Sequence, residues 1–290
     1  MGSGKTKLGL VEAQKFIAEL KVDALPVDPI KIAEDLDILV QSADIDDAGV
    51  SGMLLRRNTS FAIVYATHIQ SEGFQRFSIA HELGHYRISG HYEQLFAGGG
   101  TVHQSRSGYT SSDRFEREAD EFAAGLLMPT MLFKALVRRK SECLNTILAA
   151  AKACRTSLPA TAVRYLDVID TPAAVVLSTN GHVDFCLLSE SLMDFPQVAG
   201  VRRGSTVPKG SMTEHFSRDK ARVASAARDS NDVDLRDWFG GSRSLNGTEE
   251  VVGLGNYGKC LTFLTTPVLA DDDDEDKDLD DRWSAGFSRR

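Results

Sequence analysis

The chain has 290 residues, of which 42% are hydrophobic and 26% charged, so it is long and apolar enough to form two packed domains. Its formal net charge is −8, and the run 271–281 holds nine acids and one lysine, a net of −8 by itself, so the remainder is close to neutral. This excludes recruitment of nucleic acid by a generally basic surface, and it predicts a solvated, disordered acidic tail over residues 271–290.

The N-terminal part predicts two helices followed by two strands. Apolar residues recur at three- and four-residue spacing between Leu8 and Leu20, which is typical of one helical face. Asp28 is placed to cap a second helix over Ile30–Leu36. The apolar runs Val50–Leu55 and Phe61–Tyr65 predict strands joined by a turn.

Two longer helices are predicted on either side of a glycine-rich stretch. The first begins near Phe74 and contains residues 81–85, and the second runs from Asp113 to Met128 and stops at Pro129. The polar segment Glu93–Ser112 between them is typical of a mobile loop. Shorter helices are predicted over Met131–Arg138, Cys143–Ala153 and Ala160–Leu166.

After Asp170 the pattern changes to short extended runs. The clearest of these are Ala173–Leu177, His182–Leu187 and Lys259–Thr265. The sequence therefore predicts an α+β protein with a mainly helical first part, which contains a small sheet, and a strand-rich second domain.

The segment His81-Glu-Leu-Gly-His85 carries the clearest chemical signal. Positions i and i+4 of a helix share one face, so His81 and His85 can bind one metal ion, and Glu82 can act as the general base toward a metal-bound water. Imidazole nitrogens suit Zn²⁺, with Mn²⁺ as an alternative in vitro. The simpler alternative is a surface helix with two ordinary histidines. The apolar residues 77–80 and Gly84 favour a packed helix instead, because glycine inside a helix indicates close approach of a neighbour.

A third ligand is available in the second long helix. Glu116 and Asp120 are four residues apart and share a face, whereas Glu118 is predicted to point elsewhere. We predict Glu116 as the third metal ligand and Asp120 as the carboxylate behind His81 that accepts a hydrogen bond from its free N–H. The alternative is that these acids form solvated ion pairs with neighbouring arginines.

Cysteine usage and the N-terminus bear on the compartment. The four cysteines share no CxxC spacing, which argues against a cysteine-based zinc site and for reduced thiols. The N-terminus lacks the apolar core of a signal peptide, and no stretch approaches the ~18 apolar residues of a membrane span. We therefore expect a cytoplasmic protein with no membrane partner.

Several of these segments together resemble the ImmA/IrrE family of metallopeptidases. The resemblance rests on Phe77–His85, Glu116–Pro129, Pro26–Ala33 and Val50–Met53. It covers roughly residues 8–138, and the segment Glu249–Lys259 is more weakly similar to the C-terminal part of longer members. It implies the gluzincin arrangement, with His81, His85 and Glu116 on zinc.

The resemblance also implies a domain order and a function. The expected parts are a zinc metallopeptidase domain (1–140), a helix-turn-helix-like segment (141–168), a GAF-like domain (169–270) and the acidic tail (271–290). Members of the family cleave helix-turn-helix transcriptional repressors, which relieves repression in stress response or in mobile-element induction. The second helix of the helix-turn-helix-like segment offers only Arg164 to phosphates, with Arg155 in the turn before it, against the several phosphate contacts that useful DNA affinity needs.

Three points stay open at this level. The oxyanion of the transition state needs a stabilising donor. The candidates for this role are Tyr86, His91, His103 and Tyr109, and His91 can equally be a helix-end residue near the C-terminal dipole. Two rival functions also remain: a non-catalytic regulator that binds DNA or a repressor with a peptidase-like fold, and a ligand sensor in the C-terminal domain. The oligomeric state is not predicted.

Overall fold

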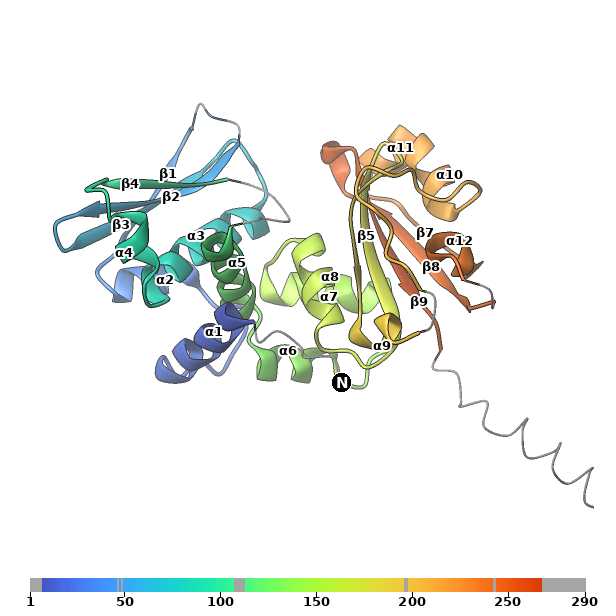
Figure 1. Ribbon diagram of the computed structural model, residues 1–290, viewed down its shortest axis with the longest axis horizontal. Helices are drawn as coiled ribbons and strands as arrows, with labels where there is room; N and C mark the ends of the chain where they lie inside the picture. The colour runs from blue at the N-terminus through green and yellow to red at the C-terminus, as the bar shows by residue number, and fades with distance from the viewer. Residues whose placement is uncertain are drawn as a thin grey trace, which may run out of the picture.

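The computed structural model describes residues 7–45, 47, 49–106, 113–195, 198–241 and 244–267. It contains two β-sheets, and helices α7 (Leu144–Cys154) and α8 (Leu158–Leu166) lie between them (Figure 1). The protein is therefore of the α+β class, as predicted. Within the described ranges no helix combines the length and apolarity needed to cross a membrane.

The first sheet has four strands in the order β1-β3-β2-β4, with β1 parallel to β3 and the other pairs antiparallel. Its strands are β1 (Leu39–Ala43), β2 (Val50–Arg57), β3 (Ser60–Ala66) and β4 (Val102–Arg106). The helices of this part are α1 (Leu8–Glu19), α2 (Pro29–Asp35), α3 (Glu72–Arg87), α4 (His91–Leu95), α5 (Arg114–Leu127) and α6 (Thr130–Val137). Helix α3 packs on β2 and β3, where Leu54 and Ile63 share a buried core with Ile79 and Leu83.

Helices α3 and α5 touch at the backbone. A Cβ added to Gly84 would lie 3.2 Å from the Cα of Ala119 and 3.2 Å from the side chain of Phe122. The glycine inside the first of the two long predicted helices indicated such a close approach. It brings the first turns of α5 beside the C-terminal half of α3.

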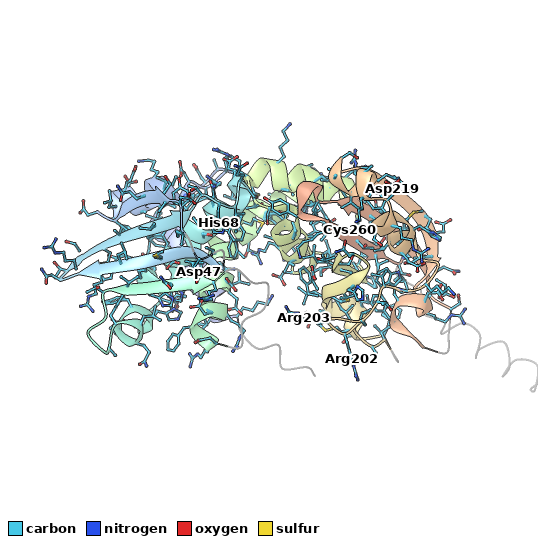
Figure 2. The ribbon with its side chains drawn as sticks, turned by 90° about the horizontal axis from the view of Figure 1, so that it is seen from above. Asp47, His68, Arg202, Arg203, Asp219 and Cys260 are labelled. Carbon is cyan, nitrogen blue, oxygen red and sulfur yellow. The ribbon has the colours of Figure 1, made fainter. Side chains whose placement is uncertain are left out.

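The second sheet has five antiparallel strands in the order β6-β5-β9-β8-β7. Its strands are β5 (Ala173–Thr179), β6 (His182–Leu188), β7 (Arg228–Asp234), β8 (Asn246–Gly253) and β9 (Lys259–Thr265). The accompanying helices are α9 (Glu190–Met193), α10 (Met212–Arg218), α11 (Lys220–Ala224) and α12 (Arg236–Phe239), with a 3₁₀ turn at Gly255–Tyr257. All four cysteines of the chain are unpaired, and Cys260 lies within this sheet (Figure 2).

Helices α7 and α8 form a packing layer. They share a buried core with Phe133 of α6 and with Val175 and Phe263 of the second sheet. Every residue of α8 is buried or only partly exposed. Arg164 is 3% exposed and donates to the carbonyl of Met128 and the hydroxyl of Thr130. The second helix of the predicted helix-turn-helix therefore offers no exposed cation to a DNA groove.

Two predictions for the first part need comment. The helices and strands predicted up to Tyr65, and both long helices, are present. The expected loop Glu93–Ser112 is wrong in part, because its residues 93–95 belong to helix α4 and its residues 102–106 form edge strand β4. Apart from Val102 the side chains of this strand are polar, so the apolar alternation that indicates a strand is missing, and pairing with β2 supplies the order instead. Residues 107–112 and the acidic tail lie outside the described residues.

Candidate metal centre

Helix α3 places both histidines of the motif in the protein interior. Ser71 caps the helix by accepting a hydrogen bond from the backbone N–H of Phe74. His81 and His85 are 6% and 0% exposed, and their Nε2 atoms are 3.0 Å apart. The i, i+4 spacing therefore aims both rings at one point.

Helix α5 supplies a third donor. Asp113 caps it by accepting a hydrogen bond from Phe115 N at 2.7 Å. One oxygen of Glu116 lies 3.3 Å from His81 Nε2, and the other lies 3.3 Å from His85 Nε2. Donor atoms from the three residues all lie within 4.8 Å of one another. The structure thus brings together the residues that were predicted as ligands.

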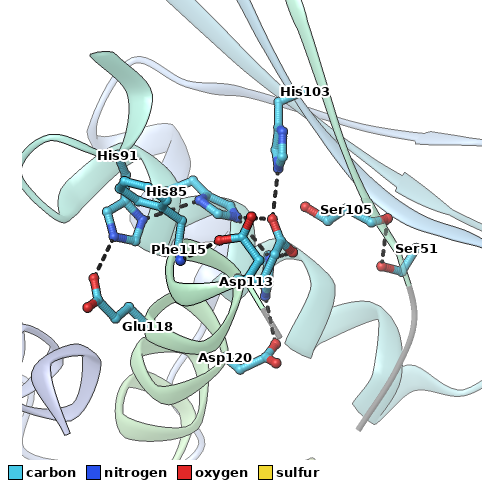
Figure 3. A network of polar contacts seen from close by, with 11 residues as sticks. Ser51, His85, His91, His103, Ser105, Asp113, Phe115, Glu118 and Asp120 are labelled. Atoms are coloured by element: carbon cyan, nitrogen blue, oxygen red, sulfur yellow. Dashed lines mark hydrogen bonds and ion pairs between the residues drawn. The ribbon is translucent and has the colours of Figure 1, made fainter. Parts of the chain in front are cut away.

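Each histidine also has a partner on its far side (Figure 3). His81 Nδ1 is 2.9 Å from the Asp120 carboxylate, which is the contact expected for that residue. His85 Nδ1 is 3.3 Å from His91 Nδ1, and His91 Nε2 is 3.0 Å from Glu118. Glu118 points elsewhere than Glu116, as predicted, but it is connected to His85 through the ring of His91.

These partners decide where the ring protons lie. An ionised carboxylate only accepts, so Asp120 holds the proton of neutral His81 on Nδ1 and leaves a lone pair on Nε2. Burial lowers the pKa of His91, which keeps that ring neutral, with Nε2–H donating to Glu118. The Nδ1 atom of His91 then accepts from the Nδ1–H of His85. With both rings neutral, the form that metal binding requires, the two histidines predicted as ligands would present Nε2 lone pairs to each other and to the carboxylate from α5.

A set of three acceptors with no donor between them suits a cation. In a tetrahedral zinc site with Zn–N distances of about 2.0–2.1 Å, neighbouring donors lie about 3.3 Å apart. The distances here are 3.0 and 3.3 Å. Residues His81, His85 and Glu116 therefore fit a divalent metal ion, zinc among them.

The hydrogen-bond acceptors of the site, together with burial, also shift the pKa values of its residues. Burial opposes protonation of His81, but its hydrogen bonds to Asp120 and Glu116 outweigh burial and raise its pKa to about 10. Burial lowers the pKa of His85 to about 3. Burial also opposes ionisation of Glu116, yet contacts with His103 and the two other histidines hold its pKa far below the usual value. A site that attracts a proton this strongly has the electrostatics that a metal ion uses.

Glu82 lies fully buried under the strands. It is 0% exposed, and neither carboxylate oxygen has a hydrogen-bond partner among the described residues. Burial raises its pKa above the ordinary value. Strand β2 passes directly over it, since a Cβ on Gly52 would lie 2.8 Å from its Oε1 atom.

The candidates for the oxyanion donor occupy different places. His103 points from β4 toward α5, with Nε2 3.2 Å from Glu116 Oε1 but without the alignment of a hydrogen bond (Figure 3). Tyr86 packs edge-on against Phe61, with ring centroids 5.0 Å apart, and His91 is held by His85. Tyr109 lies outside the described residues. Of the three that are described, His103 is the one whose ring faces the carboxylate of the ligand set.

Fold and site together define a class of protein. A helix with the pattern HExxH, a glutamate from a second helix and a small sheet beside both form a metallopeptidase-like domain. Residues 33–164 match a peptidase family model described as the IrrE N-terminal-like domain. This match confirms, over residues 33–164, the resemblance to the ImmA/IrrE family seen in the sequence.

Comparison of structures extends the likeness beyond this domain. A solved structure described as a Mycobacterium tuberculosis transcriptional regulator is similar over 90% of this chain and 77% of that chain, with 14% identity and a TM-score of 0.56. At this identity the likeness concerns the fold. No curated protein matches the sequence.

Proposed function

We propose that the protein is a zinc-dependent endopeptidase that cleaves a protein substrate. The observation that carries the proposal is the convergence of His81, His85 and Glu116 beside the buried carboxylate of Glu82, in a domain of a peptidase family. The three converging residues would hold the ion. Bound zinc supplies Lewis-acid chemistry, since it polarises a carbonyl and lowers the pKa of a water from 15.7 to roughly 7.

The chain's own residues account for the proton transfers. Glu82 accepts the proton of the attacking water and delivers it to the nitrogen of the leaving amine. Its raised pKa suits a group that must both take and return a proton. His103 is the described donor best placed for the oxyanion, because it reaches the site from β4, opposite the ligating helices.

The substrate we propose is a helix-turn-helix transcriptional repressor, whose cleavage relieves repression in stress response or mobile-element induction. Membership of residues 33–164 in the family supports this substrate class. We further propose that residues 169–270 form a GAF-like domain, in support of which the five-stranded antiparallel sheet lies wholly within that range. The unpaired cysteines support a cytoplasmic setting.

The direct test is to incubate the full chain, with zinc or manganese, with the helix-turn-helix repressor encoded nearest its gene. Cleavage at one site, detected by mass spectrometry and abolished by a chelator, is the expected result. The rival function is a non-catalytic regulator, which the neighbour's description favours. A protein that binds the repressor intact and contains no stoichiometric metal would establish the rival.

Gly52→Ala is expected to lower the cleavage rate about 10²-fold while metal content stays the same. The new methyl group would lie 2.8 Å from Oε1 of Glu82, so the carboxylate must move. A displacement of about 1 Å at a reacting group can cost about 10²-fold in rate. The measurement is kcat together with metal content by atomic spectroscopy. Gly98→Ala is the matched control, because a Cβ there meets nothing within 4 Å. Equal kcat values for the two variants would contradict the prediction.

A further inference from the structure

We propose that Glu118 and His91 are positioning residues that hold His85 in the one tautomer able to bind a metal ion. Glu118 does not touch His85. It would set the position of the His85 ring proton indirectly, through the ring of His91. The inference rests on the proposed function only in that it requires the centre to bind metal.

The contacts form a continuous line from the surface to the centre, and Figure 3 shows its inner part, from Glu118 through His91 to His85. Arg114 Nε donates to one oxygen of Glu118 at 2.6 Å. The other oxygen of Glu118 accepts from His91 Nε2 at 3.0 Å, and His91 Nδ1 lies 3.3 Å from His85 Nδ1. The ring of His91 is 1% exposed and packs edge-on against Phe115 at 4.8 Å, so it is sterically fixed.

The order of protons along this line follows from donor and acceptor chemistry. His91 is 1% exposed, and burial favours its neutral form. The carboxylate of Glu118 can only accept, so the single proton of neutral His91 lies on Nε2 and a lone pair is left at Nδ1. His85 must then carry its own proton on Nδ1 to make the contact between the rings. Its Nε2 atom is left with the lone pair that a metal needs. The two ligating histidines therefore differ, because Asp120 sets the proton of His81 directly, whereas the proton of His85 is set through a second imidazole.

In this arrangement Glu118→Gln is expected to lower metal affinity by more than the change in side-chain size and charge would. Arg114 holds the side-chain oxygen nearest to it, so the amide of Gln turns its NH₂ group toward His91. His91 must then accept at Nε2 and carry its proton on Nδ1. His85 accepts that proton at its own Nδ1 and carries hydrogen on Nε2, which blocks the metal.

The expected order of metal affinity is therefore wild type, then Glu118→Ala, then Glu118→Gln. Both variants remove the same charge, and Gln preserves the size of the side chain better than Ala. A merely structural or electrostatic role would place Gln at or above Ala. Changes to groups that orient a metal ligand typically cost 10–100-fold in affinity, and we expect the loss in Glu118→Gln to lie at the upper end of about this range.

A second variant isolates the part played by the arginine. In Arg114→Ala/Glu118→Gln the amide is free to rotate and to offer its oxygen to His91. We expect this double variant to bind metal more tightly than Glu118→Gln alone. An affinity equal to or below that of the single variant would overturn the role assigned to Arg114.

The experiment measures Zn²⁺ affinity of the full-length proteins by competition with a chromophoric chelator at one pH. It also reads the imidazole tautomers of the metal-free proteins by long-range ¹H–¹⁵N NMR, which the seven histidines of the chain make tractable. We expect the Nδ1–H form of His85 in wild type and the Nε2–H form in Glu118→Gln. Gln binding as tightly as Ala, or an Nε2–H form of His85 in wild type, would overturn the inference.

The two proposals fail in different ways. A wild type without stoichiometric zinc refutes the proposed metallopeptidase, yet the NMR tautomers still decide the relay. A wild type that binds zinc while its variants do not follow the expected order refutes the relay alone. If Glu118→Gln does not fold, the tautomer of His85 in wild type remains decisive by itself.

Discussion

Glu82→Gln is expected to lower the rate of peptide cleavage by about 10²–10⁴-fold while the protein keeps its metal. The amide has nearly the shape of the carboxylate, so it fits the space beneath β2, but it cannot accept a proton from water. The metal-binding atoms belong to other residues and stay in place. The measurement is single-turnover cleavage of the repressor together with zinc content.

A matched control lies on the same helix. Glu72 is in the first turn of α3 with its side chain 57% exposed, where it pairs with Arg155. Glu72→Gln is expected to leave the cleavage rate unchanged, because exposed ion pairs contribute little and the residue is far along the helix from the site. Wild-type rates in Glu82→Gln would refute the assignment of the general base.

The part of the site that depends on helical periodicity could be predicted from the sequence. His81 and His85 are one turn apart, as are Glu116 and Asp120, and each pair needs only its own helix to share a face. Gly84 indicated a close neighbour, although nothing in the sequence named α5 as that neighbour. Local rules therefore described each half of the ligand set but not the distance between the halves.

The rest of the site depends on contacts between distant segments. His103 enters from an edge strand whose side chains carry no apolar alternation, so no pattern marks it as ordered. The pairing of His91 with Glu118 joins a five-residue helix to the far side of α5 across 27 residues of sequence. The approach of Gly52 to Glu82 is likewise a tertiary contact, because a glycine in a strand carries no sign of what lies beneath it.

The acidic residues of α5 show that the helix face on which a residue lies does not alone decide whether it affects the site. Glu118 is about 200° from Glu116 around the helix axis, so it cannot reach the same ion, and the sequence assigned it no role. The structure gives it one because a second imidazole spans the gap. A residue on the wrong face for direct coordination can still act on a ligand through an intermediate ring, and single-helix reasoning does not include that ring.

His81→Ala is expected to abolish both metal binding and cleavage, and this is the largest effect we expect in the chain. Loss of a supporting group such as Asp120 typically costs 10–100-fold in metal affinity, and loss of a ligand must cost more. The variant leaves two donors, which are too few to hold the ion against solvent. It also removes the hydrogen bond that orients Asp120.

The effect of zinc on the Tm of His81→Ala can be measured without a substrate. A ligand present at 100 times its Kd stabilises the folded state by about 2.7 kcal/mol, so zinc should raise the Tm of wild type and leave that of His81→Ala unchanged. His182→Ala removes an exposed histidine of β6 and should respond to zinc as wild type does. An intermediate response is expected from Asp120→Asn, which keeps all three donors but weakens the support of one. If His81→Ala still bound one zinc ion and was stabilised by it, the ion would have to lie elsewhere, and the assignment of the centre to helices α3 and α5 would fail.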